Sequence, residues 1–135
     1  MDAQHKFFRL KIPSSYISDP HIQFMSANSL GKKDVVVAIS QSGTTSALLD
    51  SVRIVRKSGV KVIGIMPGRT PLADICDYPL TIDVGDNNRL SKPNTSRIAY
   101  TAVIDVMTMG VAQLKPEAQE HLYNIVDSQR SLRVK

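Results

Sequence analysis

Six consecutive residues combine hydroxyl groups, a side-chain amide and a glycine, which are groups suited to holding an anion. They are Ser40, Gln41, Ser42, Gly43, Thr44 and Thr45. A strongly apolar, β-branched run over residues 34–39 precedes them, and a pattern with helical spacing begins directly after them. At the carboxyl end of a parallel strand, free N–H groups, the positive end of the next helix dipole and the hydroxyls converge on one spot. We therefore expect this segment, the 40–45 loop, to bind a phosphate group.

Helix capping is the simpler explanation for these hydroxyls, because serine and threonine are preferred where a helix begins. Capping needs one hydroxyl, whereas Ser40, Ser42 and Thr45 supply three, beside an amide and a glycine. The composition of the loop therefore favours ligand binding over capping alone.

The elements that would position the loop follow from the periodicity of the chain. Helical spacing continues to a stop at Gly59, and residues 60–66 form a second apolar run, typical of a strand covered on both faces. A threonine followed by a proline predicts a short helix over residues 70–76, and residues 79–84 predict a third strand nearer an edge. This alternation indicates an α/β fold, a doubly wound parallel sheet with helices on both faces.

The first thirty residues predict two helices and a short strand. Residues 2–10 are typical of the last turns of a helix, and residues 13–17 would form the strand. A second helix, capped by Asp19, would end at Gly31. The expected core contacts of these helices are Phe7, Phe8, Leu10, Ile22, Met25 and Leu30.

Two more helices are predicted towards the carboxyl end, one over residues 95–114 with its cap at residues 94–96, and one that starts at Pro116. The first is apolar around much of its circumference, through Ile98, Ala99, Ala102, Val103, Val106, Met107 and Val111. Such a helix is buried by more than its own sheet, or by a partner chain. We therefore expect a homo-oligomer, most simply a dimer, of single domains that span residues 1–135.

Composition excludes several classes of protein. The length of 135 residues suits one globular domain. The net charge is +5, but the basic residues are scattered apart from clusters at residues 6–11 and 130–135, which favours a solvated surface over a nucleic-acid site. A lone cysteine, Cys76, excludes a disulfide framework and a cysteine-based metal site. The sequence shows no signal peptide and no apolar span long enough for a membrane, which favours the cytoplasm and no membrane partner.

Some residues outside the loop carry weaker indications of function. Candidates for a second anion contact near a helix start are Arg89, Lys92, Ser96 and Arg97, although solvation is the simpler role for such residues. The histidines, at positions 5, 21 and 121, lack the spacing of metal ligands, so we predict neither a metal nor a cofactor.

The pattern Ser40-Gln41-Ser42-Gly43-x-Thr45 after a valine-rich strand resembles the second phosphate-binding loop of sugar isomerase (SIS) domains. The segments 2–19, 34–45, 70–73 and 95–106 together resemble the C-terminal domain of RpiR-type bacterial transcriptional regulators, and among these the HexR-like repressors. The resemblance implies an effector-sensing domain in which the loop binds a phosphorylated sugar or sugar acid. For HexR-like proteins it suggests 2-keto-3-deoxy-6-phosphogluconate.

Two parts of RpiR-type regulators are not recognisable in the sequence: the N-terminal helix-turn-helix domain, and the first SIS strand with its Gly- and Ser-rich turn. We expect a shortened chain whose relatives contact DNA only through that absent domain, and a pocket that lacks one of two hydroxyl clusters. If the shortened pocket binds nothing, a dimerisation unit is the remaining function.

The alternative function is an aldose-ketose isomerase, which would bind the same ligand. An isomerase needs an acid and a base at the sugar carbons. Nothing in the sequence marks Asp83, Asp86 or a histidine for that role. We therefore predict a sensor with no catalytic residue rather than an enzyme.

Overall fold

The computed structural model describes residues 2–84 and 92–131, which form two compact units. One unit runs from Ile17 to Tyr100 and contains the sheet. The other combines the residues up to Tyr16 with those from Thr101 onward. Within the described ranges, no helix has both the length and the hydropathy needed to cross a membrane.

The first unit is built on a parallel sheet of three strands in the order β1 (Val35–Ile39), β2 (Lys61–Met66) and β3 (Tyr78–Thr81). The pairing of β1 with β2 ends with Ile39 opposite Ile65. Because the strands all point the same way, the loops that follow them leave the sheet at one edge. The predicted α/β fold with a parallel sheet is confirmed.

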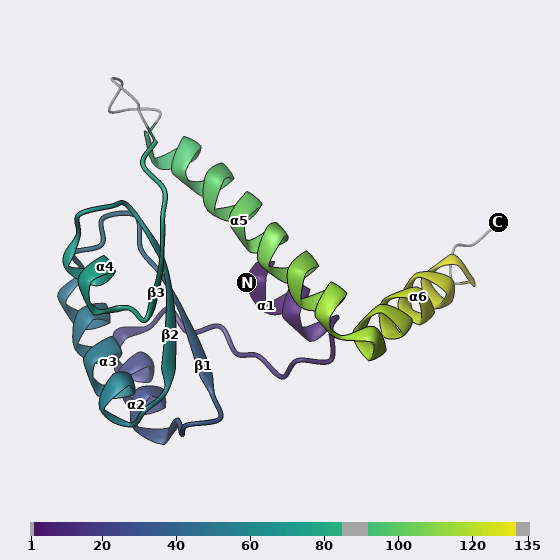
Figure 1. Cartoon of the computed structure of the whole chain (residues 1–135), viewed down its shortest axis with the longest axis horizontal. Coiled ribbons are helices and arrows are strands. Elements are labelled where there is room, and N and C mark those ends of the chain that lie inside the picture. Colours follow the sequence, from purple (N-terminus) through teal and green to yellow (C-terminus); the bar gives the residue numbers. More distant parts are fainter. Residues whose placement is uncertain (1, 85–91, 132–135) are drawn as a thin grey trace. The chain divides into compact units, whose positions relative to one another are not determined.

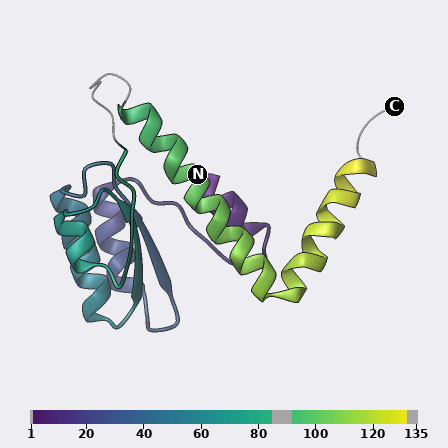
Figure 2. The same cartoon turned by 45° about the horizontal axis from the view of Figure 1, so that its top comes forward.

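Three helices lie along one face of this sheet, as Figures 1 and 2 show from two directions. They are α2 (Pro20–Ser29), α3 (Ser46–Lys57) and α4 (Pro71–Ile75). The cluster buried between helices and sheet consists of Ala27, Ala38, Leu49, Val52, Val55, Val60, Val62, Met66 and Leu72. The helical spacing predicted after the 40–45 loop therefore does mark the face of α3 that packs on the sheet.

Local sequence signals set the ends of these helices, as predicted. The Asp19 carboxylate accepts hydrogen bonds from two N–H groups in the first turn of α2, and Pro20 is the first helical residue. Gly59 follows α3 with a φ of 78°, a left-handed conformation that ends a helix. Thr70 caps α4 by accepting from the Ala73 N–H.

The second unit contains α1 (Asp2–Phe8), the later part of α5 (Lys92–Leu114) and α6 (Pro116–Ser131). The Lys6 ammonium pairs with a carboxylate of α1 and with Asp105 of α5, so it joins the two helices. The hydrogen bond to Asp105, followed by the one within α1, raises the pKa of Lys6.

The strand predicted at residues 13–17 is wrong, because this segment is irregular and connects α1 to α2. The Ser14 carbonyl accepts from the Gln4 side-chain amide at 3.1 Å, and the Ile17 carbonyl accepts from the Gln23 amide at 3.1 Å. Glutamine side chains therefore satisfy backbone groups that a neighbouring strand would otherwise have to pair.

Some of the expected core contacts are also wrong. Phe8, Ile22 and Met25 are 70%, 49% and 64% exposed. Leu10 is buried as expected, and Leu30 packs against the core. The buried residue of α2 is the small Ala27. The bulkier side chains of Ile22 and Met25 therefore lie on the exposed side of this helix.

The predicted start of the long helix is wrong as well. α5 begins at Lys92, so residues 94–96 lie inside the helix instead of capping it. Pro93 stands in the first turn, where its fixed φ and missing N–H favour an earlier start than the polar residues suggested. The predicted end at Leu114 and the start of α6 at Pro116 are confirmed.

Asp77, the residue before β3, links the start of this strand to β2 by hydrogen bonds. Its backbone N–H donates to the Val62 carbonyl at 3.0 Å, and its carboxylate accepts from the Val62 N–H at 3.0 Å. Lys61 and Arg56 lie 3.3 and 3.7 Å from the same carboxylate. The Val62 hydrogen bond, aided by these two cations, holds the pKa of Asp77 below its ordinary value.

Asp77→Asn should therefore remove part of the acid sensitivity of the fold. A lowered pKa adds stability that is complete above the ordinary value, about 3.9, and is lost as the pH falls through the folded-state value. Asparagine still accepts from the Val62 N–H but does not ionise. Urea unfolding should show the variant less stable at pH 7, with a difference that shrinks below about pH 4. A difference that stays constant down to pH 2 would contradict this role.

Candidate anion-binding site

The 40–45 loop begins where β1 ends, and Ser40 closes it into a tight turn. The Ser40 N–H donates to the Ile65 carbonyl at 3.0 Å, which extends the pairing of β1 with β2 by one residue. The Ser40 hydroxyl oxygen accepts from the Gly43 N–H at 2.9 Å, and Ser40 is only 7% exposed. This residue therefore shapes the loop, and its contact with a ligand stays a prediction.

Tyr100 of α5 holds the same point from another element. Its hydroxyl donates to the Ser40 carbonyl at 3.2 Å. Burial, with a smaller effect from the Asp83 charge, raises the pKa of Tyr100, so the phenol keeps its proton as a donor. Sequence reasoning did not select this residue, although Tyr100 is the single aromatic side chain in the sequence of α5.

Gly43 lies in the turn of this loop, at a position that strongly favours glycine. Its φ is 65°, in the left-handed region. A Cβ on Gly43 would lie 2.4 Å from Thr70 Oγ1, which is shorter than a van der Waals contact allows. The Gly43 carbonyl accepts from the Leu72 N–H at 3.1 Å.

The remaining polar side chains of the loop are exposed to solvent. The Thr44 hydroxyl donates to Ser42 Oγ at 3.1 Å, and the Thr44 N–H lies 3.3 Å from the same oxygen. Gln41, Ser42, Thr44 and Thr45 are all exposed. The loop therefore carries polar side chains on its surface, while hydrogen bonds from Ser40 to Ile65 and from Leu72 to Gly43 hold its backbone.

The amino-terminal end of α3 is open. Thr45 occupies the cap position, and in the described structure its side chain makes no capping hydrogen bond. The N–H groups of Ser46, Ala47 and Leu48 have no acceptor within the helix, as in any first turn. All of α3 is described, and its first turn carries no acidic side chain, whereas Arg56 and Lys57 stand in its last turn.

This geometry argues against capping as the role of the hydroxyls. Ser40 and Ser42 accept from N–H groups of the loop itself, and Thr45 does not cap the helix. N–H groups that have no acceptor within α3 and the positive end of the helix dipole lie next to exposed hydroxyls, an arrangement that attracts anions.

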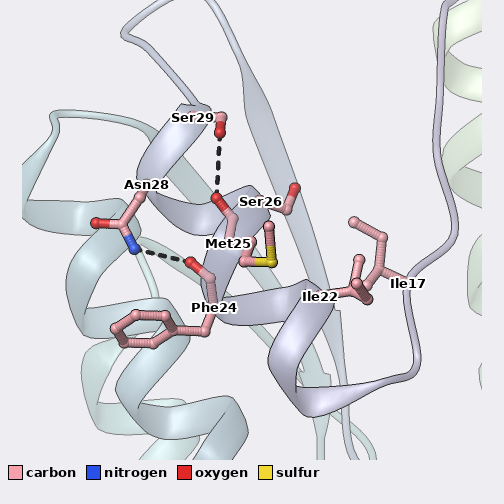
Figure 3. A pocket seen from close by; sticks show the side chains of 7 residues that line it. All are labelled: Ile17, Ile22, Phe24, Met25, Ser26, Asn28 and Ser29. Atoms are coloured by element: carbon pink, nitrogen blue, oxygen red, sulfur yellow. Dashed lines mark hydrogen bonds between the residues drawn. The ribbon is translucent and has the colours of Figure 1, made fainter.

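A shallow hollow on α2 does not contribute to this site. Figure 3 shows the side chains that line it, which come from α2 and from Ile17 and include none from the loop. The Asn28 amide and the Ser29 hydroxyl donate to carbonyls of α2 itself, at 2.8 and 3.1 Å. Its lining is mostly apolar, and no charged side chain is part of it, so it is a poor candidate for anion binding.

Of the other candidates, Arg97 is exposed on α5, and its contact with a ligand stays a prediction. Arg89 and Asp86 lie outside the described residues, as does the side chain of Lys92. Ser96 is buried within α5, and the Asp83 carboxylate accepts from the Gly68 N–H at 2.9 Å. Within the described ranges, no cluster of histidine, cysteine or acidic residues is arranged to hold a metal ion.

Gly43→Ala should destabilise the fold by at least about 1 to 2 kcal/mol, the cost of a left-handed conformation for a residue with a Cβ. The clash with Thr70 adds to that cost. Gly31→Ala is the matched control, because its Cβ would meet only Asp34 at 4.0 Å, and it should change stability by less than about 0.5 kcal/mol. Equal unfolding free energies for both variants in urea would refute the proposed fit at Gly43.

Comparison with known proteins supplies the family. The SIS domain family matches residues 1–110. The chain is 39% identical over 111 residues to the "Bifunctional protein glk" of Burkholderia thailandensis, a match that covers 82% of this chain and 17% of that protein. It is 37% identical over 109 residues to the HTH-type transcriptional regulator HexR of Escherichia coli K12, covering 81% of this chain and 38% of HexR. The chain thus spans less than half the length of either relative.

Among solved structures, the Vibrio vulnificus NanR protein complexed with ManNAc-6P is similar, with a TM-score of 0.85 at 17% identity. The match covers 98% of this chain and 51% of the NanR chain, and it supports the same fold. The sequence matches, which cover most of this chain, go further than the fold: the chain belongs to the SIS domain family.

Proposed function

We propose that this chain is the effector-sensing domain of a regulator of sugar metabolism, and that it binds a phosphorylated sugar or sugar acid at the 40–45 loop. The observation that carries the proposal is the open amino-terminal end of α3 beside the exposed hydroxyls of Ser42, Thr44 and Thr45. A phosphate placed there would accept hydrogen bonds from backbone N–H groups and hydroxyls, and it would face the positive end of the helix dipole.

The comparisons support the regulatory part of the proposal. HexR is a transcriptional regulator by name, and NanR was solved with ManNAc-6P, a phosphosugar. By analogy, Ser40, Gln41, Ser42, Gly43, Thr44 and Thr45 are the proposed ligand-binding residues. We also propose a cytoplasmic location, residues 1–135 as one SIS domain, and 2-keto-3-deoxy-6-phosphogluconate as the first effector to test.

Sensing requires more than affinity, because a ligand that binds two conformations of the protein equally well does not change their populations. The element that would carry the change is α5. Tyr100 touches the loop through the Ser40 carbonyl, and further along the same helix Asp105 pairs with Lys6. A ligand that binds the loop in its described conformation would therefore favour the arrangement in which α5 keeps this hydrogen bond.

We further propose that α5 contributes to a homodimer. Ala102, Val106 and Met109 are exposed, and at 3.6 residues per turn they fall within about 60° of one another around the helix axis. A stripe of exposed apolar side chains on a long helix is typical of a helix that packs on a partner.

Ser42→Ala should weaken binding of a phosphorylated sugar by about 1.5 to 3 kcal/mol, the range for a hydrogen bond to a charged group. Ser29→Ala is the matched control, since Ser29 is an exposed serine on α2 whose hydroxyl donates to the Met25 carbonyl of the same helix. Calorimetry of wild type and both variants with 2-keto-3-deoxy-6-phosphogluconate and glucose 6-phosphate makes the comparison. Equal affinity of the Ser42 variant and the control would remove Ser42 from the site.

The same samples discriminate the sensor from the alternative, an aldose-ketose isomerase. A sensor should leave the bound sugar phosphate unchanged in proton NMR spectra over many hours. Progressive conversion of an aldose phosphate into a ketose phosphate, lost in a heat-denatured sample, would favour the isomerase.

Met109→Glu should shift the dimer towards monomer, because it places a charge in an apolar contact. Met25→Glu is the matched control, as the two methionines are 63% and 64% exposed on different helices. Light scattering at micromolar concentration measures both variants. A monomeric wild type, or an equal response of the two variants, would count against the α5 stripe as the interface.

A further inference from the structure

A second loop, residues 67–70 after β2, packs against the 40–45 loop on its buried side. Thr70 is 8% exposed, and its side chain lies directly against Gly43. A Cβ on Gly43 would come within 2.4 Å of Thr70 Oγ1, 2.5 Å of its Cβ and 2.8 Å of its Cγ2. The Thr70 side chain therefore occupies the space where a side chain of residue 43 would stand.

The backbone after Thr70 adds a second attachment. The Leu72 N–H, in the first turn of α4, donates to the Gly43 carbonyl at 3.1 Å. Gly43 is thus held on its carbonyl by Leu72 and on its N–H by the Ser40 hydroxyl. The residue at the bend of the loop has both of its backbone polar groups engaged before any ligand arrives.

Thr70 itself is fixed by its neighbours. Its hydroxyl donates to the Pro67 carbonyl at 3.0 Å and accepts from the Ala73 N–H at 3.4 Å. At the other end of the loop, the Gly68 N–H donates to Asp83 at 2.9 Å. The 67–70 loop is therefore a rigid support rather than a loose contact.

We propose that Thr70 is a positioning residue for the ligand site: it does not touch the ligand but holds Gly43, and with it the exposed hydroxyls of the 40–45 loop and the first turn of α3, in the binding conformation. The proposal rests on the function proposed above. Its physical basis is preorganisation, since a loop that is ordered before binding does not lose that conformational freedom on binding.

Thr70→Ala tests this role, because it deletes both the hydroxyl and the methyl group that face Gly43. Binding should weaken about five- to thirtyfold, the factor that corresponds to ordering one further backbone residue. Thr70→Ser keeps Oγ and Cβ, the two atoms closest to Gly43, and should restore the affinity to within about twofold of wild type.

Asp19→Ala controls for a loss of stability alone. Asp19 caps α2 in the same unit and also precedes a proline, but none of its recorded hydrogen bonds reaches the 40–45 loop. The four proteins are titrated with inorganic phosphate and with glucose 6-phosphate, followed by ¹H–¹⁵N NMR of the Gly43 and Ser46 amides, and their melting temperatures are measured alongside.

The proposal predicts that both alanine variants melt lower and that only Thr70→Ala loses affinity. Wild-type affinity in Thr70→Ala, or parallel losses of affinity in the two alanine variants, would overturn the positioning role while leaving the loop as the site. If neither probe shifts the loop amides of the wild type, the proposed function itself fails, and the role of Thr70 falls with it.

Discussion

The parallel pairing of β1 with β2 is the constraint on which the candidate site depends. The register places Ile39 opposite Ile65, and the Ser40 N–H extends it by one hydrogen bond to the Ile65 carbonyl. Two loops that leave the sheet at neighbouring points are thereby brought together, and Gly43 meets Thr70. A different register would separate these loops and leave the 40–45 loop without its support.

The electrostatics of the site follow from the direction of α3. The helix starts at the loop, its first turn is free of acidic residues, and its basic residues, Arg56 and Lys57, lie in the last turn. Its positive end therefore points at the loop. Among the described residues, an anion bound at this end would be held by hydroxyls and N–H groups rather than by a buried cation, which would avoid the cost of desolvating a charged side chain.

Much of the fold could be predicted from sequence because its signals are local. The β-branched runs identify β1 and β2, and Asp19 with Pro20 and Thr70 with Pro71 mark helix starts. The errors concern packing: Ile22 and Met25 are apolar yet exposed, because the surface that α2 buries is set by its neighbour α3. Residues 13–17 carry strand propensity, but glutamine side chains pair with their carbonyls instead.

The site was only partly predictable for the same reason. The candidate 40–45 loop is contiguous, so its composition and its family resemblance can be read in the sequence. Thr70 and Tyr100 reach the loop through tertiary contacts that leave no trace in local sequence. The sequence predicts Thr70 as a helix cap, and this is confirmed, but a capping pattern does not indicate which residue packs against the capping side chain.

The central claim is that the 40–45 loop, with the open end of α3, binds the phosphate of a sugar phosphate. The most direct test is a ¹H–¹⁵N NMR titration of the wild-type chain with glucose 6-phosphate and, separately, with glucose. We predict that the phosphorylated sugar shifts the amides of Gly43, Thr45, Ser46 and Ala47 and that glucose does not. Equal shifts with both sugars, or shifts confined to α2, would contradict the account.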